Sequence, residues 1–265
     1  MTLLAVDDLT ITTPLRDLVS HLSLHFEPGQ RLGLIGESGS GKSLTALAAV
    51  GLLPRGMTPS GSVRLAGTEV LGAPDRALAR LRGTVTATIF QEPLTALDPL
   101  MRVGRQVAEP LQRRAHRDGR SIDAQREVLA LLEQVAITEP DRIARAYPHE
   151  ISGGQRQRVA IAMALACQPQ LLIADEPTTA LDVTTQASIL QLLDGLVRER
   201  GMALLFISHD LPIVAGIVDD VVVLRQGAAV ERGPVREVFA NPQHDYTKAL
   251  VAAARSFDAG LEHAA

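Results

Sequence analysis

Cysteine and aromatic residues are scarce in this sequence of 265 residues. The single cysteine, Cys167, excludes an internal disulfide framework and any zinc or iron–sulfur site built from cysteines alone. Aromatic residues make up 3% of the chain and tryptophan is absent, which argues against a platform on which nucleic-acid bases stack. Basic residues are not in excess either. The net charge of −4 argues against a protein that holds nucleic acid on a broad basic face.

A secretory leader and a membrane-spanning run are also missing from the pattern. Met1 to Thr13 has no positively charged start, and it carries Asp7 and Asp8 almost at once. The most apolar long stretch, Met202 to Leu224, contains several aspartates and a histidine, which are costly in a bilayer. We therefore expect a cytoplasmic protein without a transmembrane helix.

Short apolar runs alternate with helix-like stretches over most of the chain. The apolar runs are Arg31–Ile35, Thr86–Phe90, Leu171–Ala174, Ala203–Ile207 and Val221–Leu224. The helical patterns are Ser43–Leu53, Gln155–Cys167 and Val183–Arg200. Because several of the apolar runs do not alternate with polar residues, we expect strands buried on both faces of a largely parallel sheet. The alternation predicts an α/β fold.

The remaining segments predict additions to this core. Three N-terminal stretches alternate apolar and polar residues and turn at glycine, which predicts an antiparallel β layer: Leu3–Thr12, Leu18–Phe26 and Gly61–Val70. Charge density rises and strand signals vanish in 92–150, so we expect an inserted helical subdomain there. We expect the α/β core to comprise 1–91 and 151–232, and 233–265 to form a helical tail.

A phosphate-loop pattern, G-x-x-x-x-G-K-[ST], is matched by Gly36-Glu37-Ser38-Gly39-Ser40-Gly41-Lys42-Ser43. It lies between a predicted strand and a predicted helix, the context that such loops require. Glycines let backbone N–H groups point inward around phosphates, and the helix N-terminus adds favourable partial charge. We expect Lys42 to reach the β- and γ-phosphates and Ser43 to bind Mg²⁺. The alternative is a glycine-rich turn that only starts a helix.

The expected ATP-binding set ends with the motif itself. We do not expect a serine at position 45 to belong to this set, because the residue at that position is Thr45.

Two carboxylates follow the buried run Leu171–Ala174, and a proline comes after them. A strand that ends this way places Asp175 and Glu176 at the C-terminal edge of the sheet, where the phosphate loop is also expected. Asp175 suits a Mg²⁺ position, and Glu176 is free to orient and deprotonate water. The alternative is that both acids only cap the next segment.

A second candidate anion site precedes the predicted helix Arg156–Cys167, at Ile151-Ser152-Gly153-Gly154-Gln155. Ser152 suits the N-cap position, and the two glycines allow a phosphate to approach the backbone closely. Taken alone, the motif could be only a capped helix.

In their order along the chain, these motifs resemble those of the ATP-binding subunits of ABC transporters. The resemblance is carried by GESGSGKS, Gln91, ISGGQ, LLIADEP, Ala180-Leu181-Asp182 and Ser208-His209-Asp210, and it covers nearly the whole chain. Four further stretches resemble the peptide/nickel importer branch: Gln91–Pro99, Tyr147–Glu150, Ala174–Thr184 and His244–Leu250. The resemblance implies the fold of a P-loop NTPase core with an antiparallel β layer and a helical insert.

The resemblance also implies roles for the catalytic residues, with ATP and Mg²⁺ as cofactors. Gln91 would contact Mg²⁺ or the attacking water, alongside Ser43 and Asp175 as metal-binding residues. Glu176 would be the general base, and His209 would hydrogen-bond the γ-phosphate. A lone histidine at a strand end is otherwise more often structural.

The same resemblance implies a dimer and membrane partners. The signature residues Ser152, Gly153, Gly154 and Gln155 would bind the γ-phosphate of ATP held by a second cassette, identical or paralogous. Asp182 would communicate across that interface. Two integral-membrane permease subunits, and indirectly an extracytoplasmic binding protein, would complete an importer of peptides or of nickel or metal chelates at the cytoplasmic face of the inner membrane.

One departure from the family pattern concerns the adenine base. The family usually stacks adenine on an aromatic residue near the position of Thr13, but no aromatic residue precedes Phe26 here. The contact must then be aliphatic or come from elsewhere. Two alternatives to transport remain at this point: an ABC-type ATPase that acts on nucleic acid or ribosomes, and a small-molecule kinase. The kinase would leave ISGGQ and His209 unexplained.

Overall fold

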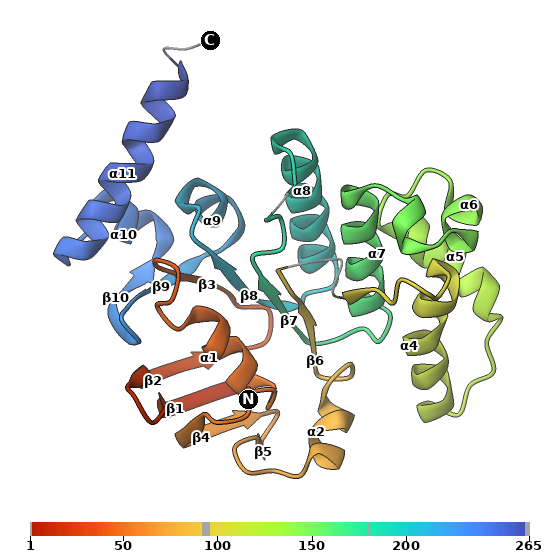
Figure 1. The fold of residues 1–265 in the computed structure, drawn as a ribbon, viewed down its shortest axis with the longest axis horizontal. Helices are drawn as coiled ribbons and strands as arrows, with labels where there is room; N and C mark the ends of the chain where they lie inside the picture. Colours follow the sequence, from red (N-terminus) through yellow and green to blue (C-terminus); the bar gives the residue numbers. More distant parts are fainter. Residues whose placement is uncertain (1, 92–95, 180, 263–265) are drawn as a thin grey trace. The chain divides into compact units, whose positions relative to one another are not determined.

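The computed structural model describes residues 2–91, 96–179 and 181–262, with side chains described as far as residue 255 (Figure 1). The chain forms two compact units. The first comprises residues 1–78 and 203–265, and the second comprises residues 79–202. Within the described ranges, none of the helices has the length and apolar character needed to span a bilayer.

An antiparallel sheet lies at the start of the first unit, in the strand order β2-β1-β4-β5. Its strands are β1 (Leu4–Thr12), β2 (Asp17–Phe26), β4 (Thr58–Leu65) and β5 (Thr68–Glu69). The predicted single strand Gly61–Val70 is wrong in its continuity, because Ala66 and Gly67 both adopt positive φ and turn the chain between β4 and β5. The expected antiparallel β layer is otherwise confirmed.

Parallel strands form the rest of the core of the first unit. They are β3 (Arg31–Ile35) between β8 (Ala203–Ser208) and β9 (Asp220–Arg225), with β10 (Ala228–Pro234) antiparallel to β9. All six residues of β8 are buried, as its unbroken apolar run predicts. A side chain at Gly33 would begin 2.8 Å from Val214, so glycine is required for the neighbouring helix to pack on β3.

The helices of the first unit are α1 (Lys42–Ala49), α9 (Leu211–Ile217), α10 (Val235–Ala240) and α11 (Asp245–Glu262), and α2 (Asp75–Leu81) spans the division between the units. Two of these helices, α10 and α11, lie within the segment expected to be a helical tail. That expectation is corrected at its start, because Gly233 and Pro234 belong to β10. Pro234 is the last residue of the strand, where its missing N–H costs no ladder hydrogen bond.

The second unit combines two parallel strands with a group of helices. The strands are β6 (Thr86–Ile89) and β7 (Leu171–Asp175). The helices are α4 (Val103–Arg117), α5 (Ala124–Gln134), α6 (Pro140–Arg145), a short 3₁₀ turn at Pro148–Glu150, α7 (Gly153–Leu165) and α8 (Val183–Glu199). Four of them pack together, α4, α5, α6 and α7, which confirms the expected helical insert (Figure 1).

Candidate active site

The phosphate loop is held by backbone groups from its own unit on several sides. A Cβ at Gly36 would lie 2.2 Å from the carbonyl oxygen of Leu224 in β9, and a Cβ at Gly41 would lie 2.9 Å from that of Leu18 in β2. The N–H of Gly227, in the β9–β10 turn, donates to the carbonyl oxygen of Ser40. The glycines at both ends of the motif are therefore required by close backbone approach, which explains their spacing physically.

The interior of the loop fits a polyphosphate. The Lys42 side chain is buried, and its Nζ donates to the carbonyl oxygens of Gly36 at 2.8 Å and Glu37 at 2.9 Å. The buried hydroxyl of Ser40 has no hydrogen-bond partner among the residues that the structure describes. A Cβ at Gly39 would meet no atom within 4 Å, so that part of the loop is open. A buried cation, an unsatisfied hydroxyl and an open glycine turn at the start of α1 are together suited to an anion.

Position 45 in α1 is occupied by a threonine, in line with the expectation that no serine there joins the ATP-binding set. The buried hydroxyl of Thr45 donates to the carbonyl oxygen of Gly41 at 2.9 Å, and the backbone N–H of Thr45 donates to the same oxygen. The hydroxyl is thus used within the first turn of the helix, as threonine hydroxyls in helices often are. Thr45 supports the end of the phosphate loop and is not assigned to the ATP-binding set.

His209 lies at the C-terminal end of β8, as the sequence predicts. The N–H of Asp210 donates to the Ser208 hydroxyl at 3.0 Å, and the Asp210 carboxylate accepts from the N–H of Ile213 as the N-cap of α9. These bonds fix the backbone on the C-terminal side of His209, and His209 itself is exposed. The Ser-His-Asp motif thus presents the imidazole between a buried strand and a capped helix.

In the second unit, the structure brings together two of the predicted catalytic residues. The Gln91 side-chain amide donates to the Glu176 carboxylate with Nε2 and Oε2 3.1 Å apart. The Thr179 hydroxyl donates to the same oxygen at 3.0 Å. Sequence reasoning did not single out Thr179. Its place three residues after an acid that ends a strand is the signal that could have found it.

Glu176 adopts a left-handed backbone conformation, with φ of 46°. This region is costly for a residue with a Cβ, and such residues gather at functional sites. Asp175 directly before it is the last residue of β7 and is buried. The carboxylates of the strand end are thus one buried and one partly exposed. Residues 92–95 and Ala180, which belong to motifs quoted above, lie outside the described residues.

The signature segment forms a capping box at the start of α7. The Ser152 hydroxyl accepts from the N–H of Gln155 at 3.2 Å, and the Gln155 side chain accepts from the N–H of Ser152 at 3.0 Å. A Cβ at Gly154 would lie 2.6 Å from the Thr185 methyl group of α8. Gly154 thus lets α7 and α8 approach at their N-termini, while Ser152 and Gly153 are exposed. The segment is therefore a helix cap, as the alternative interpretation predicts, and a role in binding an anion stays a prediction.

Asp182 caps the adjacent helix. Its carboxylate accepts from the N–H of Thr185 at 2.9 Å, and hydrogen bonds from Thr185 lower the pKa of Asp182 below its ordinary value of 3.8. Asp182 is an exposed residue. Asp182 and Ser152 are the N-caps of α8 and α7, two helices that contact each other.

The loop between β1 and β2 contains the position where an adenine-stacking residue is usual. The Thr13 hydroxyl donates to the carbonyl oxygen of Arg16 and so closes this loop. Leu15 at its tip is 94% exposed. The chain therefore offers an aliphatic side chain two residues beyond the expected aromatic position.

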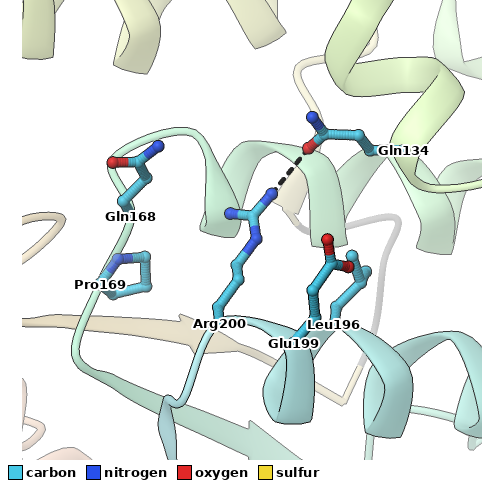
Figure 2. Close-up of a pocket in the computed structure, with 6 residues that line it drawn as sticks. All are labelled: Gln134, Gln168, Pro169, Leu196, Glu199 and Arg200. Carbon is cyan, nitrogen blue, oxygen red and sulfur yellow. Dashed lines mark hydrogen bonds between the residues drawn. The ribbon is translucent and has the colours of Figure 1, made fainter.

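A hollow in the second unit lies away from these motifs (Figure 2). It measures about 560 Å³ and is lined by residues at the C-terminal ends of α5 and α8 and just beyond α7. Arg200 points across it and donates to Gln134 at 2.7 Å (Figure 2). Ser152 and Asp182 lie at the opposite ends of α7 and α8. The hollow therefore includes none of the predicted site residues.

Comparisons with known proteins agree with this set of motifs. Residues 19–179 match the family described as ABC transporter. The chain is 47% identical over 260 residues to the oligopeptide transport ATP-binding protein OppD of Salmonella typhimurium, covering 97% of this chain and 77% of that protein. It is 52% identical over 237 residues to the peptidoglycan transport ATP-binding protein YejF of Agrobacterium fabrum. That match covers 89% of this chain and 43% of YejF, so the chain spans less than half of that longer relative.

A solved structure supports the same fold. The dimeric post-hydrolysis structure of the ATP-binding cassette MJ0796 bound to ADP and Pi is 27% identical to this chain, with a TM-score of 0.76. The match covers 88% of this chain and 99% of the cassette. The α/β fold with an antiparallel β layer and a helical insert is thus shared with a nucleotide-binding cassette.

Proposed function

Because this chain belongs to the ABC transporter family, we propose that it is the ATP-hydrolysing subunit that powers peptide import through a membrane permease. The observation that carries the ATPase assignment is the hydrogen bond between Gln91 and Glu176. A small-molecule kinase would use the phosphate loop, but it gives no reason for this pair or for the Ser152 capping box. An ATPase uses a carboxylate to activate water, and the side-chain amide of Gln91 can orient both the Glu176 carboxylate and that water molecule.

The catalytic roles follow from the groups that each residue offers. Lys42 leaves its two carbonyl partners to bind the β- and γ-phosphates, and the N-terminus of α1 adds partial positive charge. Glu176 accepts a proton from the attacking water, a contribution of about 10²–10⁴-fold in rate. His209 donates a hydrogen bond to the γ-phosphate. Catalysis is then mainly positioning and charge stabilisation.

Ser43 of the first unit, and Gln91 and Asp175 of the second, would each offer Mg²⁺ an oxygen ligand of the kind that it prefers: hydroxyl, carbonyl or carboxylate. When bound with ATP, it would neutralise phosphate charge. Clusters of three or more histidine, cysteine, aspartate or glutamate side chains that could hold a metal do not occur among the residues that the structure describes. The metal site would therefore depend on the nucleotide's own oxygens, as nucleotide-bound Mg²⁺ usually does.

A second cassette, identical or paralogous, would complete each ATP site. The exposed Ser152 and Gly153 at the N-terminus of α7 offer a hydroxyl and helix N–H groups to the γ-phosphate of ATP on that partner. Asp182, exposed on the adjoining α8, would sense the same interface. The dimeric structure of the cassette MJ0796 supports this proposal. ATP binding would close the pair, and hydrolysis would remove the contacts that hold it shut.

The permease would dock on the helical part of the second unit. A groove of about 270 Å³ lies between α4, α5 and α6, with apolar walls that include Ala108, Val128 and Ala144. Charged residues such as Arg105 and Asp141 line it as well. An amphipathic helix of one permease subunit would suit this groove on each of the two cassettes. The cassette would then act peripherally at the cytoplasmic face of the inner membrane, below an extracytoplasmic binding protein.

Peptide is the cargo that the relatives favour. OppD is named for oligopeptide transport and YejF for peptidoglycan transport, whereas nickel or a metal chelate has no support from these names. The test is import of a labelled oligopeptide into vesicles that contain the cassettes, the permease and the binding protein, with Ni²⁺ as the competing cargo. Peptide uptake that requires ATP supports the proposal. Nickel uptake instead, or ATPase activity stimulated by nucleic acid or ribosomes alone, would contradict it.

A further inference from the structure

The C-terminal helix contacts the phosphate loop through one side chain. Tyr246, in the first turn of α11, is 7% exposed, and its hydroxyl oxygen accepts a hydrogen bond from the backbone N–H of Glu37 at 2.8 Å. We propose that Tyr246 is a positioning residue that holds the phosphate loop in the conformation that binds ATP. This inference rests on the proposed function, because it concerns the same nucleotide site.

The peptide group between Gly36 and Glu37 is held at both of its polar ends. Its carbonyl oxygen, on Gly36, accepts from Lys42 Nζ, and its N–H, on Glu37, donates to Tyr246. When ATP draws Lys42 towards the phosphates, the carbonyl end is released. Tyr246 is then the side chain that still fixes the plane of this peptide group. A rotated peptide would move the Gly36–Glu37 carbonyls and the start of the loop.

The neighbours of Tyr246 make its position well defined. The guanidinium carbon of Arg225, the last residue of β9, lies 5.1 Å from the centre of the tyrosine ring. Leu224, the residue before it, is the one whose carbonyl oxygen abuts Gly36. The end of β9 therefore supports both the tyrosine ring and the first glycine of the phosphate loop. Burial raises the pKa of Tyr246 above its ordinary value of 10.0, so the phenol stays neutral and keeps its acceptor role at physiological pH.

A separate set of bonds ties the start of α11 to the sheet. The Glu231 carboxylate of β10 accepts from the N–H groups of Gln243 at 2.8 Å and His244 at 3.0 Å. His244 Nδ1 in turn accepts from the N–H of Tyr246 at 3.1 Å. The helix therefore begins at a fixed place relative to β10. The segment His244–Leu250, which the catalytic assignment leaves unused, gains a role as an anchored support of the nucleotide site.

The test compares Tyr246→Phe with the unaltered chain for Mg·ATP affinity and for ATPase kinetics with the partner subunits. Phenylalanine keeps the ring beside Arg225 and removes only the hydroxyl. Because the competent loop becomes less populated, we expect the apparent Kd and KM for ATP to rise about two- to tenfold, the range for one neutral hydrogen bond. We expect kcat at saturating ATP to stay close to that of the parent. A merely structural role would lower the melting temperature without this split.

Two matched variants control for unspecific effects. Lys248→Gln removes an exposed ion pair with Asp245 from the same turn of α11. Tyr147→Phe removes the other tyrosine hydroxyl of the chain. The guanidinium of Arg102 approaches the ring of Tyr147, as that of Arg225 approaches the ring of Tyr246. Both variants should leave ATP affinity at the parental value. If Tyr246→Phe binds ATP as tightly as these controls, the inference is wrong while the proposed function stands. If the unaltered chain does not bind ATP, the proposed function itself fails.

A measurement on the unaltered chain keeps the inference testable should Tyr246→Phe not fold. The Glu37 amide should exchange its hydrogen slowly without nucleotide, because its N–H is bonded to a buried acceptor. The exposed amide of Gly39 in the same loop provides the comparison. Exchange of Glu37 at the rate of an unprotected amide would overturn the inference.

Discussion

Two glycines of the phosphate loop allow a sharp test of why the loop has its sequence. At Gly36, a Cβ would lie 2.2 Å from the carbonyl oxygen of Leu224, whereas at Gly39 it would meet nothing within 4 Å. Both residues have positive φ, 149° and 80°, so alanine is strained at either position. The two substitutions therefore share a backbone penalty and differ in the steric overlap.

The overlap at Gly36 sets the expected magnitude. A real Cβ keeps about 3.0 Å from such an atom, so the loop and β9 must separate by about 0.8 Å or more in Gly36→Ala. A misplacement of about 1 Å in a site of this kind costs about 10²-fold in catalytic rate. Gly39→Ala carries only the strain of a left-handed alanine, about 1–2 kcal/mol. Because that strain is present with and without nucleotide, it lowers stability and leaves affinity nearly unchanged.

The assay is titration of each purified variant with a fluorescent ATP analogue and Mg²⁺, together with thermal unfolding. Gly36→Ala should bind the analogue more weakly than the parent, and its rate of ATP hydrolysis should fall about 10²-fold. Gly39→Ala should bind nearly as the parent does and melt a few degrees lower. Equal losses of affinity in the two variants would refute the reasoning, since they would show that backbone conformation alone, and not contact with Leu224, makes Gly36 necessary.

Three further substitutions test the other parts of the site. Glu176→Gln should keep ATP binding and trap an ATP-bound dimer, because the amide oxygen still accepts from Gln91 and Thr179. The rate of phosphate release should fall about 10²–10⁴-fold. Phosphate release at the parental rate would show that Glu176 is not the general base. Ser152→Ala should cost about 1 kcal/mol of stability, because the N-cap of α7 is lost. It should abolish cooperative hydrolysis and leave the affinity of the monomer for ATP unchanged. Loss of ATP binding by the monomer would instead place Ser152 in the ATP site of its own chain. Asp182→Asn should be less stable than the parent at neutral pH. Because the pKa of Asp182 is lowered in the folded chain, its charged form stabilises above the ordinary value of 3.8, and calorimetry should show the difference shrink as pH falls through the lowered pKa; a difference independent of pH would contradict this.

Local pattern was enough to predict most of the core. The unbroken apolar runs of β3, β7 and β8 identify strands buried on both faces, and the phosphate-loop motif follows one of them. Patterns of this kind depend only on residues close in sequence. The same reasoning missed β10, where Gly233 and Pro234 are residues that strands disfavour, and the 3₁₀ turn before the signature.

Long-range contacts could not be predicted in this way. Tyr246 and Glu37 are 209 residues apart in sequence, and no periodicity or spacing links a tail helix to one amide of the phosphate loop. Gln91 and Glu176 are 85 residues apart, and only the resemblance to a family implied that both serve one reaction. Ser152 and Asp182 were predicted for roles between chains. The structure adds that both already act as N-caps within this one.

The conformation of Glu176 connects these observations. A left-handed glutamate after β7 costs about 1–2 kcal/mol, yet the chain turns there so that one carboxylate oxygen accepts from both Gln91 and Thr179. Two donors on one oxygen fix the orientation of the carboxylate, as suits a group proposed to act on water. Release of either donor would change the orientation of the carboxylate, and with it the direction in which the proposed general base faces the water.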